Sequence, residues 1–448
     1  MASSTQGFAR ASPGRLVLSG FTGFSLLGTV LLLLPVSRSA EAGADFVDAL
    51  FTSVSAVCVT GLIVVDTPTY WSGFGQAVIV LLIQVGGFGA MTFASLLGLL
   101  LYRRLGMKTR VTAAAETKTV GIGDVRTVIK NVAITSLQVE AVVAVLLTLR
   151  FWLGYDRFSF GEALWQGVFH AVSSFNNAGF SLFSDNLIPF AEDPFIILPV
   201  VVAVVLGGIG FPVILELRRR ISPRHWTLHV RLTLITTAVL IIGGWIYFLA
   251  VEWSNQATLG GFGLDGRLLV SLMQSTMPRT AGFNSIDYGQ MTDEGLLGTI
   301  VLMFIGGGSA GTAGGIKVTT FAVLMLAVWA ELRGEQEVHV FHRRVDSRVT
   351  RQAFSLGALA SGVVVLATIV LMMLEEAGPL PLFFEAVSAF GTVGLSTGIT
   401  FDLSRGSEIV LVVLMLIGRV GPITAITALA LRSAPRHFSY PEGRPIIG

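Results

Sequence analysis

Hydrophobic residues occur along the chain in long blocks that shorter polar connections separate. A helix needs about 20 predominantly apolar residues to cross the hydrocarbon core of a bilayer. The pattern predicts eight membrane-spanning helices over residues 16–36, 74–102, 129–153, 194–217, 228–251, 296–331, 353–374 and 408–431. The first block also fits a signal peptide, because Arg10 and Arg15 precede it and small residues follow it. The internal repeat described below favours a span.

The connections alternate in charge. One set is basic, for example around Arg103, Arg218, Arg343 and Arg432, whereas the other set is rich in Asp and Glu. Basic connections are retained in the cytoplasm during membrane insertion. The pattern therefore places the basic connections and both termini in the cytoplasm, and the acidic connections outside.

Each outward connection contains an apolar segment that is too short to span a membrane. These segments cover residues 46–57, 161–175, 268–277 and 382–390, and each precedes a short string with a glycine in it. The four strings, here called the filter strings, are Val59-Thr60-Gly61-Leu62, Asn177-Ala178-Gly179-Phe180, Thr280-Ala281-Gly282-Phe283 and Thr392-Val393-Gly394-Leu395. A single string would fit an ordinary tight turn or a helix contact. Four strings on one face of the membrane indicate a repeated structural unit.

A second glycine motif follows each filter string at a similar distance. The four copies begin Val85-Gly86-Gly87, Leu206-Gly207-Gly208, Ile305-Gly306-Gly307 and Ile417-Gly418-Arg419. The chain is thus predicted to contain four repeats of span, half-helix, glycine loop and span. They cover residues 1–110, 111–223, 224–345 and 346–448. The predicted fold is an all-α polytopic membrane protein with eight transmembrane helices and four re-entrant pore helices around a pseudo-fourfold pore.

The repeated loops favour the binding of a cation. Irregular backbone at membrane depth is tolerated only where it faces protein or a water-filled cavity. Four glycine-bearing loops around a shared axis meet this condition, and their carbonyl oxygens can replace the hydration shell of a monovalent cation. The half-helices would also direct the negative ends of their dipoles to this axis. We expect K+ to be bound by Thr60, Gly61, Ala178, Gly179, Ala281, Gly282, Val393 and Gly394.

The second span of the third repeat contains a stretch that a helix tolerates poorly. Each glycine costs about 1 kcal/mol in a helix interior, and six glycines occur between residues 306 and 315. We expect a broken helix whose loop lies beneath the filter and acts as a gate; close helix packing through small residues is the alternative. The predicted gate comprises Gly306, Gly307, Gly308, Ser309, Ala310, Gly311, Thr312, Ala313, Gly314 and Gly315, together with Arg419.

Arg419 lies about half-way along the last apolar block. In the other repeats its position is held by Gly87, Gly208 and Gly307. An arginine at this depth is costly and faces a cavity or a partner. It is expected either to form a structural pair with an acid or with carbonyl groups, or to act as a positive barrier beneath the filter that contacts the loop through Ser309 or Thr312.

The composition excludes several classes of function. Only 13% of the 448 residues are charged and 53% are hydrophobic, whereas soluble domains contain roughly 25% charged residues. The net charge of +2 gives no indication of nucleic-acid binding, and the single cysteine, Cys58, excludes an internal disulfide. The sequence contains no HExxH, CxxC, G-x-S-x-G or Walker A pattern. We expect no enzymatic activity and no cofactor bound by this chain.

These motifs resemble the Trk/Ktr/HKT superfamily of potassium transporters, and most closely its KtrB type of membrane subunit, over essentially the whole chain. The filter glycines of that family match Gly61, Gly179, Gly282 and Gly394, and its intramembrane gating loop and arginine match residues 306–315 and Arg419. The resemblance implies K+ uptake across the plasma membrane by a homodimer with one pore per protomer. It also implies a cytosolic nucleotide-binding ring of the KtrA type as regulatory partner, and it leaves open whether Na+ is an activator.

Two other functions remain as alternatives. The first is a sodium-permeable HKT-like or TrkH-like transporter; plant relatives that prefer sodium often carry serine at the position of Gly61, so the glycine here favours potassium. The second is an alternating-access carrier, which would normally contain inverted repeats. All four repeats here run in the same direction, which disfavours a carrier.

Overall fold

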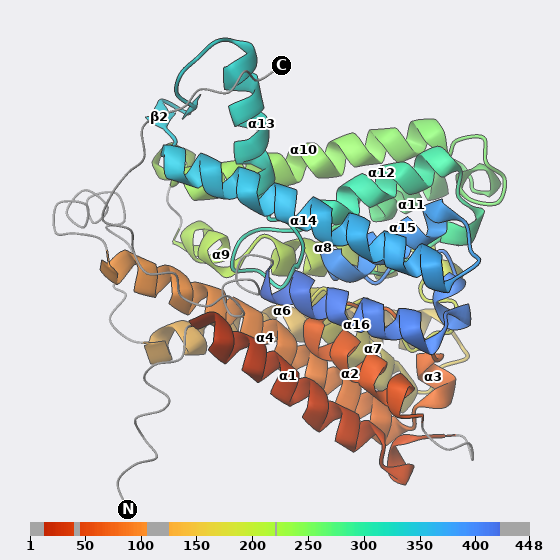
Figure 1. Ribbon diagram of the computed structural model, residues 1–448. Helices are drawn as coiled ribbons and strands as arrows, with labels where there is room; N and C mark the ends of the chain where they lie inside the picture. The colour runs from red at the N-terminus through yellow and green to blue at the C-terminus, as the bar shows by residue number, and fades with distance from the viewer. Residues whose placement is uncertain (1–12, 40–44, 105–124, 220–221, 422–448) are drawn as a thin grey trace, which may run out of the picture.

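Helices dominate the computed structural model of the protein (Figure 1), which describes residues 13–39, 45–104, 125–219 and 222–421. Within these ranges the strands are confined to one short antiparallel hairpin, β1 (His339–Val340) and β2 (Arg343–Arg344). The 3-10 helices are η2 (Pro35–Ser37), η3 (Ile188–Phe190), η4 (Pro223–His225), η5 (Leu259–Gly261), η6 (Tyr288–Gln290) and η7 (Ile399–Asp402). The protein is therefore predominantly helical, as the sequence predicted.

The α-helices follow the order expected for the four repeats. The first two repeats contain α1 (Pro13–Leu32), α2 (Phe46–Cys58), α3 (Thr67–Tyr70), α4 (Gly73–Arg104), α6 (Val125–Gly154), α7 (Phe160–Phe175), α8 (Pro194–Gly208) and α9 (Phe211–Arg218). The last two contain α10 (Leu228–Val251), α11 (Leu264–Thr276), α12 (Asp293–Phe304), α13 (Val318–Leu332), α14 (Ser347–Leu374), α15 (Pro379–Gly391) and α16 (Arg405–Val420).

Each of the four short apolar segments forms a helix of its own, namely α2, α7, α11 and α15. Capping side chains explain where α2 and α7 begin. The Asp45 carboxylate accepts a hydrogen bond from the backbone N–H of Val47, and Ser159 and Glu162 form a capping box at the start of α7. Such side chains satisfy N–H groups that have no partner within the helix. The helices α2 and α15 end directly before their filter strings, α7 ends one residue before its string, and α11 ends three residues before its string.

Several helices are long and apolar enough to cross a membrane. Within the described residues four helical segments meet this criterion alone, and the bent pair α8 and α9 would be a fifth if it counts as one span. The four are Gly73–Thr92, Ile129–Gly154, Leu228–Val251 and Ser347–Leu374. Shorter apolar helices include Val17–Leu32, Phe46–Cys58, Val318–Leu332 and Pro379–Gly391. The last predicted span, 408–431, extends beyond the described residues.

The prediction of one continuous span over residues 194–217 is wrong. The chain forms α8 and α9 there, and the axes of the two helices differ by 101°. Gly210 stands at the break with φ +96°, outside the range of a helix. The predicted span 296–331 is also divided, into α12 and α13, so the glycine-rich stretch between them is not helical.

The helices pack in a cycle. The first long helix of each repeat contacts the short helix of the same repeat, as in the pairs α1–α2, α6–α7, α10–α11 and α14–α15. The helix that follows each filter string contacts the short helix of the next repeat, in the pairs α4–α7, α8–α11, α12–α15 and α16–α2. In Figure 1, α16 accordingly lies beside α1 and α2, although these helices come from opposite ends of the chain. The four short helices are thereby arranged around one axis.

A cluster of charged side chains joins the N-terminal ends of α2 and α16. The guanidinium group of Arg405 lies 2.5 Å from the carboxylate of Asp45, 2.5 Å from that of Asp48 and 2.8 Å from that of Glu408. The side chains of Asp48 and Glu408 are only 12% and 5% exposed, so each would be left buried without its partner if the arginine were removed. An isolated buried charge is strongly destabilising.

We predict that Arg405→Met lowers the free energy of unfolding by about 1–3 kcal/mol, less than for a fully buried pair because the arginine is half exposed. Thermal unfolding of the purified protein in detergent measures the change. Asp45→Asn is the control: its carboxylate is 42% exposed, and the expected loss is below about 1 kcal/mol. Equal, small losses of unfolding free energy in both variants would show that Arg405 does not stabilise the contact between α2 and α16.

Candidate ion-binding site

The four filter strings share one unusual backbone conformation. Each begins with a non-glycine residue in the left-handed region, which disfavours side chains. These residues are Val59 (φ 56°), Asn177 (φ 59°), Thr280 (φ 78°) and Thr392 (φ 49°). The glycine two positions later also has a positive φ in every string: 90° at Gly61, 71° at Gly179, 70° at Gly282 and 95° at Gly394. The strings are therefore four copies of one loop conformation.

These loops close into a ring. A Cβ atom on Gly61 would overlap the carbonyl oxygen of Ala178 in the second loop. The same relation connects the other loops in order, with Gly179 against Ala281, Gly282 against Val393, and Gly394 against Thr60. The last contact returns to the first loop, so the ring is complete. Only glycine permits backbones to approach this closely at a positive φ.

The ring contains all eight residues predicted to bind an ion. The filter strings contain no charged side chain, so backbone carbonyl and hydroxyl oxygens are the ligands that they offer. Carbonyl rings of this kind suit a dehydrated monovalent cation, whereas Ca²⁺ usually requires carboxylates. The arrangement can therefore hold a monovalent cation by its backbone.

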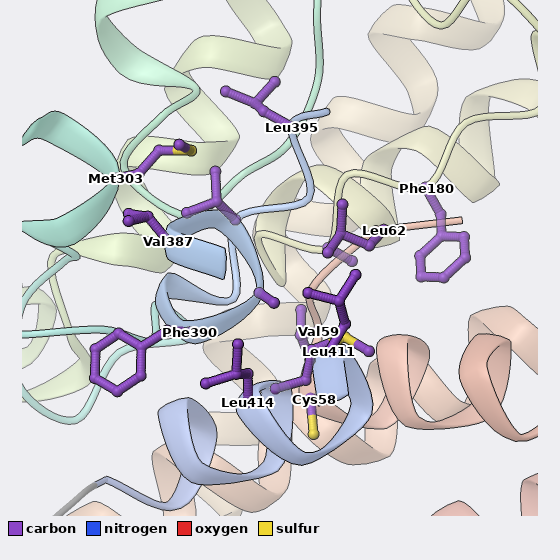
Figure 2. Close-up of a cluster of buried hydrophobic side chains, with 14 of the residues drawn as sticks. Cys58, Val59, Leu62, Phe180, Met303, Val387, Phe390, Leu395, Leu411 and Leu414 are labelled. Atoms are coloured by element: carbon purple, nitrogen blue, oxygen red, sulfur yellow. The ribbon is translucent and has the colours of Figure 1, made fainter. Parts of the chain in front are cut away.

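Buried apolar side chains pack around the ring and hold the filter strings in place. Val59, Leu62 and Leu395 are each 1% exposed and belong to one hydrophobic cluster with Phe180. Figure 2 shows these side chains among those of α15 and α16, including Phe390 and Leu411. The remaining apolar residue at the end of a filter string, Phe283, is also fully buried, in a second cluster. Dense packing of this kind resists changes in the diameter of the ring.

The segment between α12 and α13, here called the 305–317 loop, packs on the break between α8 and α9. The backbone N–H of Gly308 donates to the carbonyl of Gly208 at 2.7 Å, and the N–H of Phe211 donates to the carbonyl of Ala310 at 3.1 Å. The missing side chain of Gly210 leaves room for the carbonyl of Ser309. The bend in the second repeat thus accommodates the loop of the third repeat.

The same loop reaches the beginnings of two filter strings. The hydroxyl of Thr312 lies 3.0 Å from the side-chain amide of Asn177, the first residue of the second string. On the other side, a Cβ atom on Gly314 would overlap the hydroxyl of Thr392, the first residue of the fourth string. The loop therefore extends from one side of the ring to the other.

Arg419 connects this loop to the first repeat. Its Nη1 donates to the carbonyl of Thr312, and its Nη2 donates to the carbonyl of Gly86 at 3.1 Å. No carboxylate pairs with Arg419 among the described residues, so its partners are carbonyl groups. Ser309, the other partner considered from the sequence, instead has its hydroxyl 3.2 Å from that of Thr319.

Comparison with known proteins places this architecture in a family. A family model described as "TrkH: Cation transport protein" matches residues 17–439. The chain belongs to the TrkH family. The resemblance drawn from the sequence motifs is confirmed by this match.

Relatives within the TrkH family align over almost their whole length. The chain is 38% identical to the Ktr system potassium uptake protein B of Bacillus subtilis, with 98% of each chain covered. It is 36% identical to the protein of the same name from Vibrio alginolyticus, covering 98% of this chain and 96% of the relative. The crystal structure of the potassium transporter TrkH from Vibrio parahaemolyticus matches with a TM-score of 0.75 at 19% identity, covering 95% and 87% of the two chains. That similarity shows a shared fold.

Sequence reasoning missed a set of serines that hold the filter strings of this TrkH-family chain. The hydroxyl of Ser55 accepts from the N–H of Gly61 at 3.0 Å and donates to the carbonyl of Leu62 at 2.8 Å. Ser173 donates to Phe180 in the second string, and Ser388 accepts from Gly394 in the fourth. All three serines stand at the same offset before a filter glycine, and Thr276 holds that position in the third repeat. This recurrence is the signal that could have revealed them.

We predict that Ser55→Ala lowers the free energy of unfolding by about 1–3 kcal/mol, because the buried N–H of Gly61 and carbonyl of Leu62 each lose a partner. Thermal unfolding in detergent measures the loss. Ser136→Ala is the matched control, since its hydroxyl only donates to the carbonyl of Val132 one turn earlier in α6. A loss no larger than that of the control would show that Ser55 does not hold the string.

Proposed function

We propose that this chain is the potassium-translocating subunit of a Ktr-type uptake system. The observation that carries the proposal is the closed ring in which each filter glycine adjoins a carbonyl oxygen of the next loop. Relatives at 38% and 36% identity are named Ktr system potassium uptake protein B, which supports the same role here. The activity is transport, and the protein is not an enzyme.

In this proposal K+ loses its hydration shell and passes through the ring along its axis. Carbonyl oxygens of the four filter strings replace the lost water ligands. Support comes from the helices α2, α7, α11 and α15, each of which ends within three residues of a filter string. Their C-terminal ends carry partial negative charge, which favours a cation at the ring.

The gate in this proposal consists of the 305–317 loop and Arg419. The loop would obstruct the passage below the ring, and the arginine would retain it through the carbonyl of Thr312. The support is structural: the loop contacts the second and fourth filter strings, and Arg419 attaches it to Gly86 of the first repeat. A positive charge at this place would also repel an approaching cation.

We propose that the chain is an integral membrane protein with eight spans and four re-entrant pore helices. Two of the spans would be interrupted, one between α8 and α9 and the other between α12 and α13. In this proposal the basic connections and both termini lie on the cytoplasmic side of the plasma membrane, which the excess of Lys and Arg in those connections supports. The lipid-facing surface carries exposed apolar residues such as Leu146, Val239 and Met373.

Two partners belong to the proposal. One is a second copy of the chain, giving a homodimer with a pore in each protomer. The other is a cytosolic nucleotide-binding ring of the KtrA type, since the relatives are named as parts of a Ktr system. Such a ring would move the 305–317 loop by binding differently to the closed and open states.

A second candidate is transport of Na+ together with K+. It is favoured by one relative, 36% identical over 98% of both chains, whose name is Potassium/sodium uptake protein NtpJ. Na+ could enter either as a second transported ion or as an activator. The flux measurements described next compare both ions.

We predict that Gly61→Ser lowers the ratio of K+ to Na+ flux by about tenfold, the change that a 1.4 kcal/mol loss of discrimination produces. The new side chain would displace the carbonyl of Ala178 and strain a residue at φ +90°. Ion flux into proteoliposomes that contain the purified protein measures the ratio. Gly362→Ser is the control, because a Cβ atom there meets nothing within 4 Å. An unchanged ratio in Gly61→Ser would exclude the ring as the selectivity filter, and no K+ flux in either the parent or Arg419→Ala would exclude the function.

We predict that Arg419→Ala raises the K+ flux measured without the regulatory partner about tenfold, because a charge-assisted hydrogen bond contributes about 1.5–3 kcal/mol to the retained state. Arg419→Lys should give a smaller rise, since lysine keeps the charge but cannot bridge two carbonyls with a planar fork. Flux is compared at matched protein amounts in proteoliposomes. Unchanged flux with a lowered melting temperature in Arg419→Ala would make the arginine a structural tie instead of a part of the gate.

A further inference from the structure

A fully buried acid lies behind the fourth filter string. Glu385, in α15, has no exposed surface. Its Oε1 accepts from the hydroxyl of Ser396 at 2.6 Å and from the backbone N–H of Thr397 at 3.1 Å. Its Oε2 accepts from the hydroxyl of Thr400 at 2.8 Å. The carboxyl group thus holds the segment that directly follows the filter string.

The ionised form of the group can accept all three of these hydrogen bonds, because an ionised carboxylate accepts at both oxygens without donating. The hydroxyl of Thr400 also lies 2.7 Å from the hydroxyl of Ser396, so its single proton is given to one of the two acceptors at a time. No Lys, Arg or His side chain pairs with Glu385 among the described residues. A buried charge that has hydrogen bonds but no counter-ion is costly, so a cation held close by would stabilise it.

The second repeat has a neutral counterpart at the same position. His170 precedes Gly179 at the same offset as Glu385 precedes Gly394. The Nδ1 of His170 lies 2.8 Å from the carbonyl of Gln166 and must donate to it, which leaves Nε2 to accept from Ser181 at 3.0 Å. Ser181 follows Gly179 at the offset at which Ser396 follows Gly394.

The two networks match in a further detail. The hydroxyl oxygen of Ser181 accepts from the N–H of Phe183 at 3.0 Å, and that of Ser396 accepts from the N–H of Gly398 at 2.9 Å. The second and fourth repeats, which face each other across the ring, therefore hold their outer segments in the same way. Only one of the two acceptors, the glutamate, can carry a negative charge.

The first and third repeats have Thr52 and Met273 at the corresponding positions, and neither side chain is ionisable. In the third repeat the neighbouring Gln274 instead donates from its side-chain amide to the hydroxyl of Ser285 at 3.1 Å. Glu385 is consequently the only acidic residue among the four equivalent positions, and it departs from the fourfold symmetry of the ring.

We propose that Glu385 is the fixed negative charge that raises the affinity of the ring for K+, and that it also positions the outer segment of the fourth filter loop. The proposal rests on the potassium-translocating function proposed above. The charge is attached through Ser396 and Thr397 to the same short segment whose Gly394 adjoins the ring. The transported cation supplies the missing countercharge, and the electrostatic attraction is strengthened by burial.

The test compares Glu385→Gln, which removes the charge at nearly constant shape, with Glu385→Asp, which keeps it. Two quantities are measured for each: the K+ concentration that gives half-maximal thermal stabilisation in detergent, and the half-saturating K+ concentration for uptake into proteoliposomes. Glu385→Gln should raise both about tenfold or more, the effect of losing one nearby charge in a partly screened site. Glu385→Asp should raise them less.

Glu375→Gln is the matched control. Glu375 also accepts from a serine N–H and hydroxyl, those of Ser404, but this contact lies at the protein surface, at the residue that caps α16. It should leave both K+ concentrations unchanged. Unchanged values in Glu385→Gln, or equal losses in the glutamine and aspartate forms, would overturn the role of the charge. If both the parent and Arg419→Ala are stabilised by K+ but neither takes it up, the proposed function fails, while the stabilisation curves still decide the role of Glu385.

Discussion

The close approach of each filter glycine to a carbonyl of the neighbouring loop is the constraint on which the remaining structure depends. Four such contacts can exist together only if four loops with the same conformation meet around one axis. The short helices must then end at the axis, and the following helix of each repeat must pack against the short helix of the next. Serines such as Ser55 and Ser388 hold the backbone in the required conformation. The ring of carbonyl groups is thus a result of how the repeats fit together.

Departures from fourfold symmetry are concentrated around the 305–317 loop. The third repeat has the 305–317 loop in place of a continuous helix, and the second repeat bends at Gly210 to admit it. The fourth repeat has Arg419 where the others have glycine, and its partners are the loop and the first repeat. These changes are mutually dependent, because each provides the space or the hydrogen bonds that another needs. A symmetric scaffold therefore carries one asymmetric element.

The sequence predicted the short helices and the filter strings well, because they depend on local patterns. The expected segment 46–57 corresponds to α2 (Phe46–Cys58), and glycine at a left-handed position needs no distant partner to be recognised. The bend at Gly210 was missed because residues 194–217 are apolar throughout, and the bend is set by contact with the carbonyl of Ser309 from another repeat. Ser55 was missed because a serine in an apolar helix more often bonds to its own helix. Both features depend on contacts between residues that are distant in the sequence or on the fold of a loop, which local sequence patterns do not reveal.

The charged cluster around Arg405 has a consequence for how the polypeptide is arranged. Consecutive repeats are joined by the chain itself at three of the four junctions, but the fourth and first repeats are joined by non-covalent contacts, including Arg405 with Asp48 and Arg419 with Gly86. The cyclic arrangement is therefore formed by a linear chain whose first and fourth repeats meet at one seam. A circularly permuted chain, with its termini between the second and third repeats, would join the fourth and first repeats covalently at the place where ion pairs now hold them together. The ion pairs therefore mark the junction at which a covalent connection could replace non-covalent contacts.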